Sequence, residues 1–260
     1  MNDPAVNDSQ EETMAVKGSW PRAIFYDSKT TLFDWGWSWA TASEALVKRY
    51  DSAIDPKEFA SNWVRLFEAH HRRTAFAGYT PVTEIITEAL MDTFRILDIP
   101  GEPTDVSAYT ELQKDVGLFE ETESALREQQ ELGVKIWTYS DVERKYLDMY
   151  VSKFKNFKPD FVGSTEEAHF HKPNPRTYAW VLHQNDMQPR DVLFCAAPSF
   201  DVQGAMSYGL LAARLQRPTA KKSDGVLANE ADGSRGITPD YVIESLNDIT
   251  TIIRANRGDA

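Results

Sequence analysis

The chain has 260 residues, of which 42% are hydrophobic, and its 40 acidic and 28 basic side chains give a formal net charge of −12. This length allows one large core, or a core with an inserted subdomain. The negative charge would repel a phosphate backbone, so we expect no nucleic-acid partner. The single cysteine excludes an internal disulfide, and no apolar run reaches the ~18 residues of a membrane span. These features predict a cytoplasmic protein with no membrane partner.

The amino-terminal segment differs in composition from the rest of the chain. Residues 1–18 are polar and acidic, and they contain no hydrophobic segment typical of a secretory signal. We expect these residues to form a mobile tail. The first ordered element is a predicted strand at residues 22–26, where a bulky apolar run stops at Asp27 in the manner of a buried parallel strand.

Residues 40–110 have the spacing of amphipathic helices. Asp55 followed by Pro56 predicts a helix N-terminus, with an N-cap and a proline at the first helical position. The segment from Thr83 to Leu97 carries apolar residues at helical intervals. We therefore predict a helical cap at residues 40–110, inserted into a core that is made of residues 19–39 and 111–260.

From about residue 119 onward, short apolar strands alternate with helices. The predicted strands are at 134–139, 160–163, 192–196 and 210–215, the helices are at 121–131, 142–153, 175–184 and 202–208, and an apolar run at 241–243 precedes a last helix. This alternation is typical of an α/β fold, with a doubly wound parallel sheet and helices on both faces. Residues 218–238 are rich in Lys, Ser, Gly and Asp, and they predict a solvated flap.

Polar side chains follow four of the predicted strands at the point where each strand ends. In an open parallel sheet, ligands gather at the carboxyl ends of the strands. The sequence therefore predicts one crevice in which carboxylates, hydroxyls and a lysine converge. These side chains are Asp27, Thr31, Ser140, Asp141, Lys172, Ser199 and Asp201.

The run from Phe25 to Asp34 resembles the first motif of the haloacid dehalogenase superfamily. Its Leu32–Phe33–Asp34 ending and the spacing from Lys172 to Tyr178 are most similar to the L-2-haloacid dehalogenases. The resemblance extends from about residue 22 to 250, and the companion motifs follow in order: Ser140 after a strand, the segment Lys172–Tyr178, and the segment Phe200–Ala205.

The resemblance implies that Asp27 is a nucleophile, which attacks the 2-carbon of a small carboxylate substrate and forms an ester that water hydrolyses. It implies that Lys172 holds Asp27 ionised, and that Asp201 orients Lys172 or the water. Ser140 is the fourth catalytic residue implied. Thr31, Tyr178 and Ser199 are implied to bind the substrate or to complete this network. Local helix capping remains an alternative role for Thr31 and Ser140.

Two substitutions argue against the phosphoryl-transferring branch of the superfamily. Those members carry a second Asp two residues after the nucleophile, and a metal-binding carboxylate four residues before the equivalent of Asp201. This chain has Lys29 and Ala197 at those positions. Because phosphoryl transfer relies on a divalent ion, we do not expect phosphatase activity, and we expect no metal and no cofactor.

The chain also departs from the dehalogenases around the leaving group. Asp141 stands where those enzymes have an asparagine beside the halide, Lys29 replaces a tyrosine, and Arg65 is an inexact counterpart of their cap arginine. An ionised Asp141 would repel a halide by about 4 kcal/mol at ~4 Å and an effective dielectric of ~20. It would favour a protonated amine, to which Trp35, Trp37 or Trp39 could add a cation–π contact if they face the site. Hydrolysis of L-azetidine-2-carboxylate, with opening of its C–N bond, is therefore the alternative function.

Other interpretations stay open at this point. Asp141 could instead cap the helix that starts at Val142, and the tryptophans could serve only to pack the cap. A catalytically silent binding protein would not need Asp27, Lys172 and Asp201 together. A homodimer through the apolar cap helices is a further hypothesis. We interpret four histidines as ordinary surface or site-edge side chains rather than metal ligands: His70, His71, His169 and His171.

Overall fold

The computed structural model describes residues 20–218 and 238–257. The predicted tail and nearly all of the predicted flap lie outside the described residues. One sheet of six parallel strands has the order β3-β2-β1-β4-β5-β6, which confirms the predicted α/β class. The strands are β1 (Ala23–Asp27), β2 (Lys135–Ser140), β3 (Phe161–Ser164), β4 (Val192–Ala196), β5 (Leu211–Leu215) and β6 (Tyr241–Ile243).

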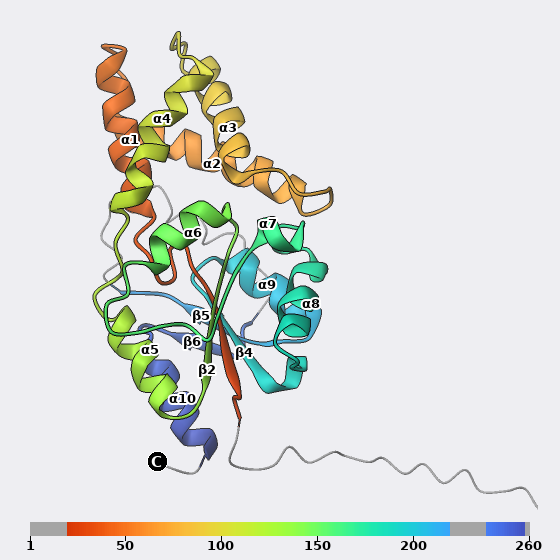
Figure 1. Ribbon diagram of the computed structural model, residues 1–260. Helices are drawn as coiled ribbons and strands as arrows, with labels where there is room; N and C mark the ends of the chain where they lie inside the picture. Colours follow the sequence, from red (N-terminus) through yellow and green to blue (C-terminus); the bar gives the residue numbers. More distant parts are fainter. Residues whose placement is uncertain (1–19, 219–237, 258–260) are drawn as a thin grey trace, which may run out of the picture.

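Helices cover both faces of this sheet (Figure 1). The central strand β1 is buried throughout and contributes Ile24 and Tyr26 to one core cluster and Phe25 to the other, because successive side chains of a strand point to opposite faces. The first cluster includes side chains of α5 (Thr122–Glu131), α6 (Arg144–Val151) and α10 (Asn247–Arg257). The second includes side chains of α7 (Thr165–Ala168), α8 (Pro175–Gln184) and α9 (Ser199–Tyr208).

A second group of helices stands above the carboxyl ends of the strands (Figure 1). It contains α1 (Gly36–Arg49), α2 (Pro56–Thr74), α3 (Val82–Ile96) and α4 (Ser107–Thr110), and these helices share an apolar cluster around Trp39 and Trp63. Asp55 caps α2 as predicted, since its carboxylate accepts the backbone N–H of Lys57 at 2.9 Å. The first helix begins at Gly36, before the predicted start at residue 40.

Polar contacts hold this helical group against the strand ends. Nδ2 of Asn174 donates to the carbonyl of Ala75 at 2.7 Å, and the carboxylate of Glu143 accepts the backbone N–H of Thr83 at 3.0 Å. The Glu143 contact lies in the first turn of α3, where helical N–H groups have no partner within the helix. Both ends of the connection between α2 and α3 are thus fixed relative to the sheet, and a cavity forms between the two parts.

Several elements differ from the sequence prediction. Helix α9 begins at Ser199 rather than at residue 202, which brings Asp201 into its first turn. Short helices α4 and α7 were not predicted, and neither were the 3-10 segments Pro103–Val106, Glu111–Asp115 and Pro189–Asp191. These pieces are too short to show a hydrophobic period. Among the described residues, no helix is long and apolar enough to cross a membrane.

Candidate active site

Asp27 is the last residue of β1, and two neighbours hold its carboxylate. Oγ1 of Thr31 donates to Oδ2 at 2.7 Å, and Nζ of Lys172 donates to Oδ1 at 2.6 Å. The Thr31 hydroxyl oxygen also accepts the backbone N–H of Ala197 at 2.9 Å, which ties the turn after β1 to the end of β4. Both oxygens of Asp27 therefore have a fixed direction at the centre of the sheet edge.

Lys172 is fully buried and lies among three carboxylates. Its ammonium group bonds Asp27 and Asp201, and it lies 3.6 Å from Oδ2 of Asp141. Burial alone would lower the pKa of Lys172, but these carboxylates raise that pKa well above its usual value. The lysine therefore stays protonated and compensates part of the negative charge around it.

Asp141 follows β2 and is also buried. Its Oδ1 accepts the backbone N–H of Lys172 at 3.0 Å. Burial opposes ionisation, but Lys172 and the adjacent His171 hold the pKa of this carboxyl well below its usual range. The N-cap of α6 is Glu143, and Asp141 makes no cap hydrogen bond to that helix. The capping alternative for Asp141 is therefore wrong, and its charge faces the site.

Asp201 differs electrostatically from Asp141. Burial, together with Asp27 and Asp141, raises the pKa of Asp201 well above its usual value, although Lys172 acts in the opposite direction. Its Oδ1 has no hydrogen-bond partner among the described residues. The Asp201 carboxylate is thus a proton acceptor with one free oxygen.

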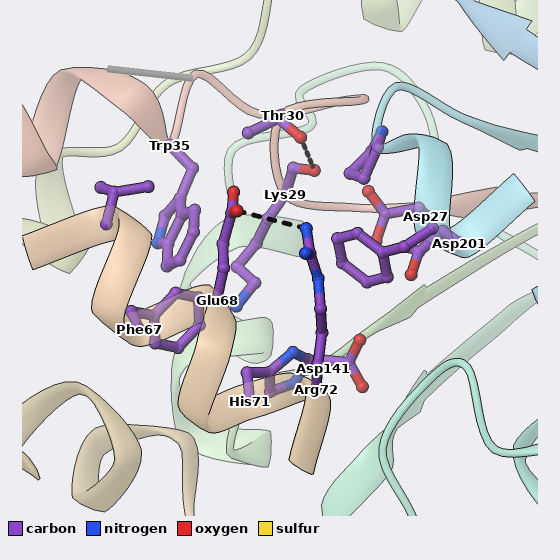
Figure 2. Close-up of a pocket in the computed structure, with 13 residues that line it drawn as sticks. Asp27, Lys29, Thr30, Trp35, Phe67, Glu68, His71, Arg72, Asp141 and Asp201 are labelled. Atoms are coloured by element: carbon purple, nitrogen blue, oxygen red, sulfur yellow. Dashed lines mark hydrogen bonds and ion pairs between the residues drawn. The ribbon is translucent and has the colours of Figure 1, made fainter. Parts of the chain in front are cut away.

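The cavity lies between the strand ends and α2 (Figure 2). Its lining brings the core carboxylates against aromatic and charged side chains of the helical group. The lining residues are Asp27, Lys29, Thr30, Trp35, Val64, Phe67, Glu68, His71, Arg72, Asp141, Pro198, Phe200 and Asp201.

Lys29 projects into this cavity beside aromatic rings. Its Nζ lies 4.0 Å from the centroid of the Trp35 ring and 5.8 Å from that of Phe67. Burial lowers the pKa of Lys29 to about 8, although Asp141 and Asp27 act to raise it. Trp35 faces the cavity as the sequence analysis expected, whereas Trp39 packs inside the helical group and Trp37 is 39% exposed.

Six predicted site residues do not line the cavity, and two of them, Thr31 and Lys172, contact Asp27 from behind it. Tyr178 is fully buried in the core, and its hydroxyl donates to the backbone carbonyl of Asp201 at 3.1 Å, so direct substrate binding by Tyr178 is not supported. Arg65 is exposed on α2 and donates to Asn62 of the same helix at 3.1 Å. Ser140 is buried, and its Oγ has no hydrogen-bond partner in the part of the chain that the structure describes; Ser199 is buried in the first turn of α9.

The position of Arg65 has a simple geometric reason. The face of α2 that meets the cavity carries Val64, Phe67, Glu68, His71 and Arg72, which recur at intervals of three and four residues. Arg65 is one residue off this stripe and turns to solvent. The sequence contains the stripe, but helical spacing alone does not say which face of the helix meets the cavity.

Arg72 is the arginine that the sequence analysis missed. Its guanidinium lies 5.5 Å from the centroid of the Phe200 ring, and its Nη2 donates to Glu68 at 3.2 Å (Figure 2). It supplies a positive charge on the helical side of the cavity, opposite the carboxylates. Such a charge suits recognition of an anionic group.

Two of the four histidines that were interpreted as surface or site-edge side chains are buried, and one of them, His71, lines the cavity. His71 and His171 are 3% and 0% exposed, so neither is a surface side chain. Burial lowers the pKa of His71 to about 3, despite the nearby Asp141 charge. Their side chains meet at the carboxylate of Asp141, a contact that joins residues far apart in the chain.

Comparison with known proteins gives a consistent result. Residues 81–214, just over half of the chain, match the family described as haloacid dehalogenase-like hydrolase. The chain is 24% identical over 203 residues to (S)-2-haloacid dehalogenase 1 of Pseudomonas sp. (strain CBS-3), which covers 75% of this chain and 85% of that protein. It is 28% identical over 116 residues to (S)-2-haloacid dehalogenase of Xanthobacter autotrophicus, but this match covers 38% of this chain and only 44% of that protein.

The same fold is present in solved structures. The L-2-haloacid dehalogenase from Xanthobacter autotrophicus matches with a TM-score of 0.74 and 21% identity, over 90% of this chain and 98% of that chain. The defluorinating L-2-haloacid dehalogenase Rha0230 matches with a TM-score of 0.72 and 18% identity, over 90% of this chain and 95% of that one. These likenesses concern the fold.

Proposed function

Because the chain belongs to the haloacid dehalogenase-like hydrolases, we propose that Asp27 is its nucleophile and that the substrate is a small carboxylate with a leaving group on its 2-carbon. The observation that carries this proposal is the pair of hydrogen bonds from Lys172 and Thr31, at 2.6 and 2.7 Å, which orient the Asp27 side chain at a cavity. A fixed carboxylate in a buried site is preorganised for attack.

The proposed reaction has two steps. In the first, a carboxylate oxygen of Asp27 forms a bond to the 2-carbon, and the leaving group departs with its bonding electrons. In the second, water adds to the carbonyl carbon of the resulting ester, the acyl C–O bond breaks, and the 2-hydroxy acid leaves. Asp201 is suited to accept the proton of that water, because its Oδ1 is free and its pKa is raised.

The cavity also offers groups for the substrate carboxylate. Lys29 and Arg72 are cationic side chains that line it from the core and from α2. Arg72 replaces Arg65 in this proposal, because Arg65 points to solvent. A phosphatase reaction has less support, since Lys29 and Ala197 stand where that branch carries an acid and a metal-binding carboxylate.

A second candidate function differs from the first in its leaving group. The lowered pKa of Asp141 keeps a negative charge on the wall of the cavity. That charge repels a departing halide and attracts a protonated amine. The rings of Trp35 and Phe67 also line the cavity, where they contact the Lys29 ammonium group at 4.0 and 5.8 Å. Opening of the C–N bond of L-azetidine-2-carboxylate by Asp27 therefore remains a specific alternative.

The test is a turnover assay, with chelator present, run in parallel on L-2-chloropropionate and L-azetidine-2-carboxylate. Halide release from the first substrate supports a dehalogenase, and ring opening of the second without halide release supports the amine alternative. Asp27→Asn should abolish whichever activity is found. Asp141→Asn should raise halide release relative to ring opening. No turnover of either substrate by the folded wild-type protein would contradict the proposal.

A further inference from the structure

Three buried side chains meet beside the Asp27 cavity, and two of them, His71 and His171, have no role in the proposed displacement. A ring nitrogen of His71, a ring nitrogen of His171 and a carboxylate oxygen of Asp141 all lie within 4.8 Å of one another. They come from α2, from the loop before α8 and from the end of β2. Figure 2 shows the His71 ring next to the Asp141 carboxylate.

The hydrogen bonds of His171 leave one ring nitrogen facing this cluster. Its Nε2 donates to the carbonyl of Thr80 at 2.7 Å, because a carbonyl oxygen can only accept. In the neutral ring, Nδ1 then carries a lone pair, and it lies 3.2 Å from Oγ1 of Thr165 and 3.4 Å from Oδ1 of Asp141. A bound metal ion would replace the hydrogen bond that the Thr165 hydroxyl can donate to this nitrogen. Metal-binding histidines characteristically donate their other N–H to a backbone carbonyl or a carboxylate, which fixes the ring.

One ring nitrogen of His71 makes no hydrogen bond to the described residues. Its Nε2 is buried and has no hydrogen-bond partner among the described residues. The ring is held by packing, since it stacks on Phe67 with centroids 5.4 Å apart and meets the His171 ring at 4.9 Å. A buried polar atom without a partner is unfavourable and points to an absent ligand.

The local charge also suits a cation. One ammonium group, that of Lys172, lies among the carboxylates of Asp27, Asp141 and Asp201. Its contact with Asp141, at 3.6 Å, is longer than its 2.6 Å contact with Asp27. Asp141 therefore has a weaker contact with the ammonium group than Asp27 does.

We propose that His71, Asp141 and His171 form a binding site for a divalent transition metal ion such as Zn²⁺. Two imidazoles and one carboxylate are the donors that such ions prefer, whereas Mg²⁺ and Ca²⁺ prefer sites made of oxygen alone. His71 and Asp141 line the cavity, so a fourth coordination position is open toward Asp27. The three ligands become close only in the folded chain.

The test is a titration of metal-free protein with Co²⁺, followed by its visible absorption, and competition of Zn²⁺ with a coloured chelator. We expect one equivalent to bind, and excess Mg²⁺ not to displace it. His71→Ala and His171→Ala should each weaken binding at least about 100-fold, since even outer-shell changes cost 10–100-fold. His183→Ala, an exposed histidine on α8, is the matched control and should bind as the wild type does.

Absence of stoichiometric binding by the wild-type protein would overturn the site, and so would unchanged affinity in His71→Ala. The wild-type titration decides even if a variant fails to fold. The readout does not depend on turnover, so the metal site and the proposed hydrolase reaction stand or fall separately.

Discussion

The backbone N–H of Lys172 donates to Oδ1 of Asp141 at 3.0 Å, while Nζ of the same lysine lies 3.6 Å from Oδ2 of that carboxylate. Asp141 therefore holds Lys172 at its main chain as well as at its charged end. This double contact directs the ammonium group toward Asp27 at 2.6 Å. Asp141 thus belongs to the support of the nucleophile, in addition to facing the leaving group.

Removal of the Lys172 charge should destabilise the fold strongly. Lys172→Met leaves Asp27, Asp141 and Asp201 buried without their shared cation, and breaking such buried pairs costs about 3–5 kcal/mol. Urea unfolding of the variant measures this loss. The control is Lys135→Met, which removes a 61% exposed lysine paired with Asp160 and should cost less than about 1 kcal/mol. Equal losses in the two variants would contradict the prediction.

The Thr31 hydroxyl should matter for the rate of the first step. Thr31→Val keeps the shape of the side chain but removes the 2.7 Å hydrogen bond to Asp27 and the acceptor for Ala197 N–H. A hydrogen bond to a charged group contributes about 1.5–3 kcal/mol, so kcat should fall by roughly 10- to 100-fold. Thr31→Ser retains the hydroxyl and should restore most of the rate. Wild-type kcat in Thr31→Val would exclude this role.

Two arginines of α2 offer a matched pair for substrate recognition. Arg72 lines the cavity, whereas Arg65 faces solvent. Arg72→Ala should raise KM for a carboxylate substrate about tenfold, because a charge-assisted contact of at least ~1.4 kcal/mol is lost. Arg65→Ala should leave KM unchanged. Steady-state kinetics of both variants on the same substrate measures the two KM values. A larger increase of KM in Arg65→Ala than in Arg72→Ala would show that Arg65, and not Arg72, recognises the substrate.

The buried amine of Lys29 should make stability depend on pH in the alkaline range. Its pKa is lowered from 10.5 to about 8, mainly by burial. Between these values the unfolded chain binds more protons at this position than the folded chain does. The contribution of Lys29 to the free energy of unfolding therefore increases as pH rises, by at most about 1.4 kcal/mol per pH unit.

Lys29→Met removes this titration. The difference in unfolding free energy, wild type minus variant, should rise from pH 8 to pH 10 in chemical denaturation experiments. The subtraction removes the other groups that titrate in the same range. A difference that stays flat or falls over this interval would show that the amine keeps its usual pKa in the folded protein.

The sequence by itself determined the sheet and the positions of its polar ends. The apolar runs at β1 and β4 are bounded by polar residues, and the helix at Pro175–Gln184 has clear start and stop signals. In a parallel sheet all carboxyl ends meet at one edge, so Asp27, Lys172 and Asp201 could be placed together from the order of strands alone.

Only the tertiary structure decided which side chains of the helices face that edge of the sheet. The rotation of α2 about its axis places Arg72 at the cavity and Arg65 in solvent. A helical period of 3.6 residues defines the faces of α2 but does not say which face lies against the sheet edge. The meeting of His71 with His171 joins residues a hundred positions apart, for which no local pattern exists. In the sequence, Asp141 stands before a helix and therefore has the local pattern of a helix cap. The fold instead places the backbone N–H of Lys172 against its carboxylate, a contact that the local sequence does not indicate.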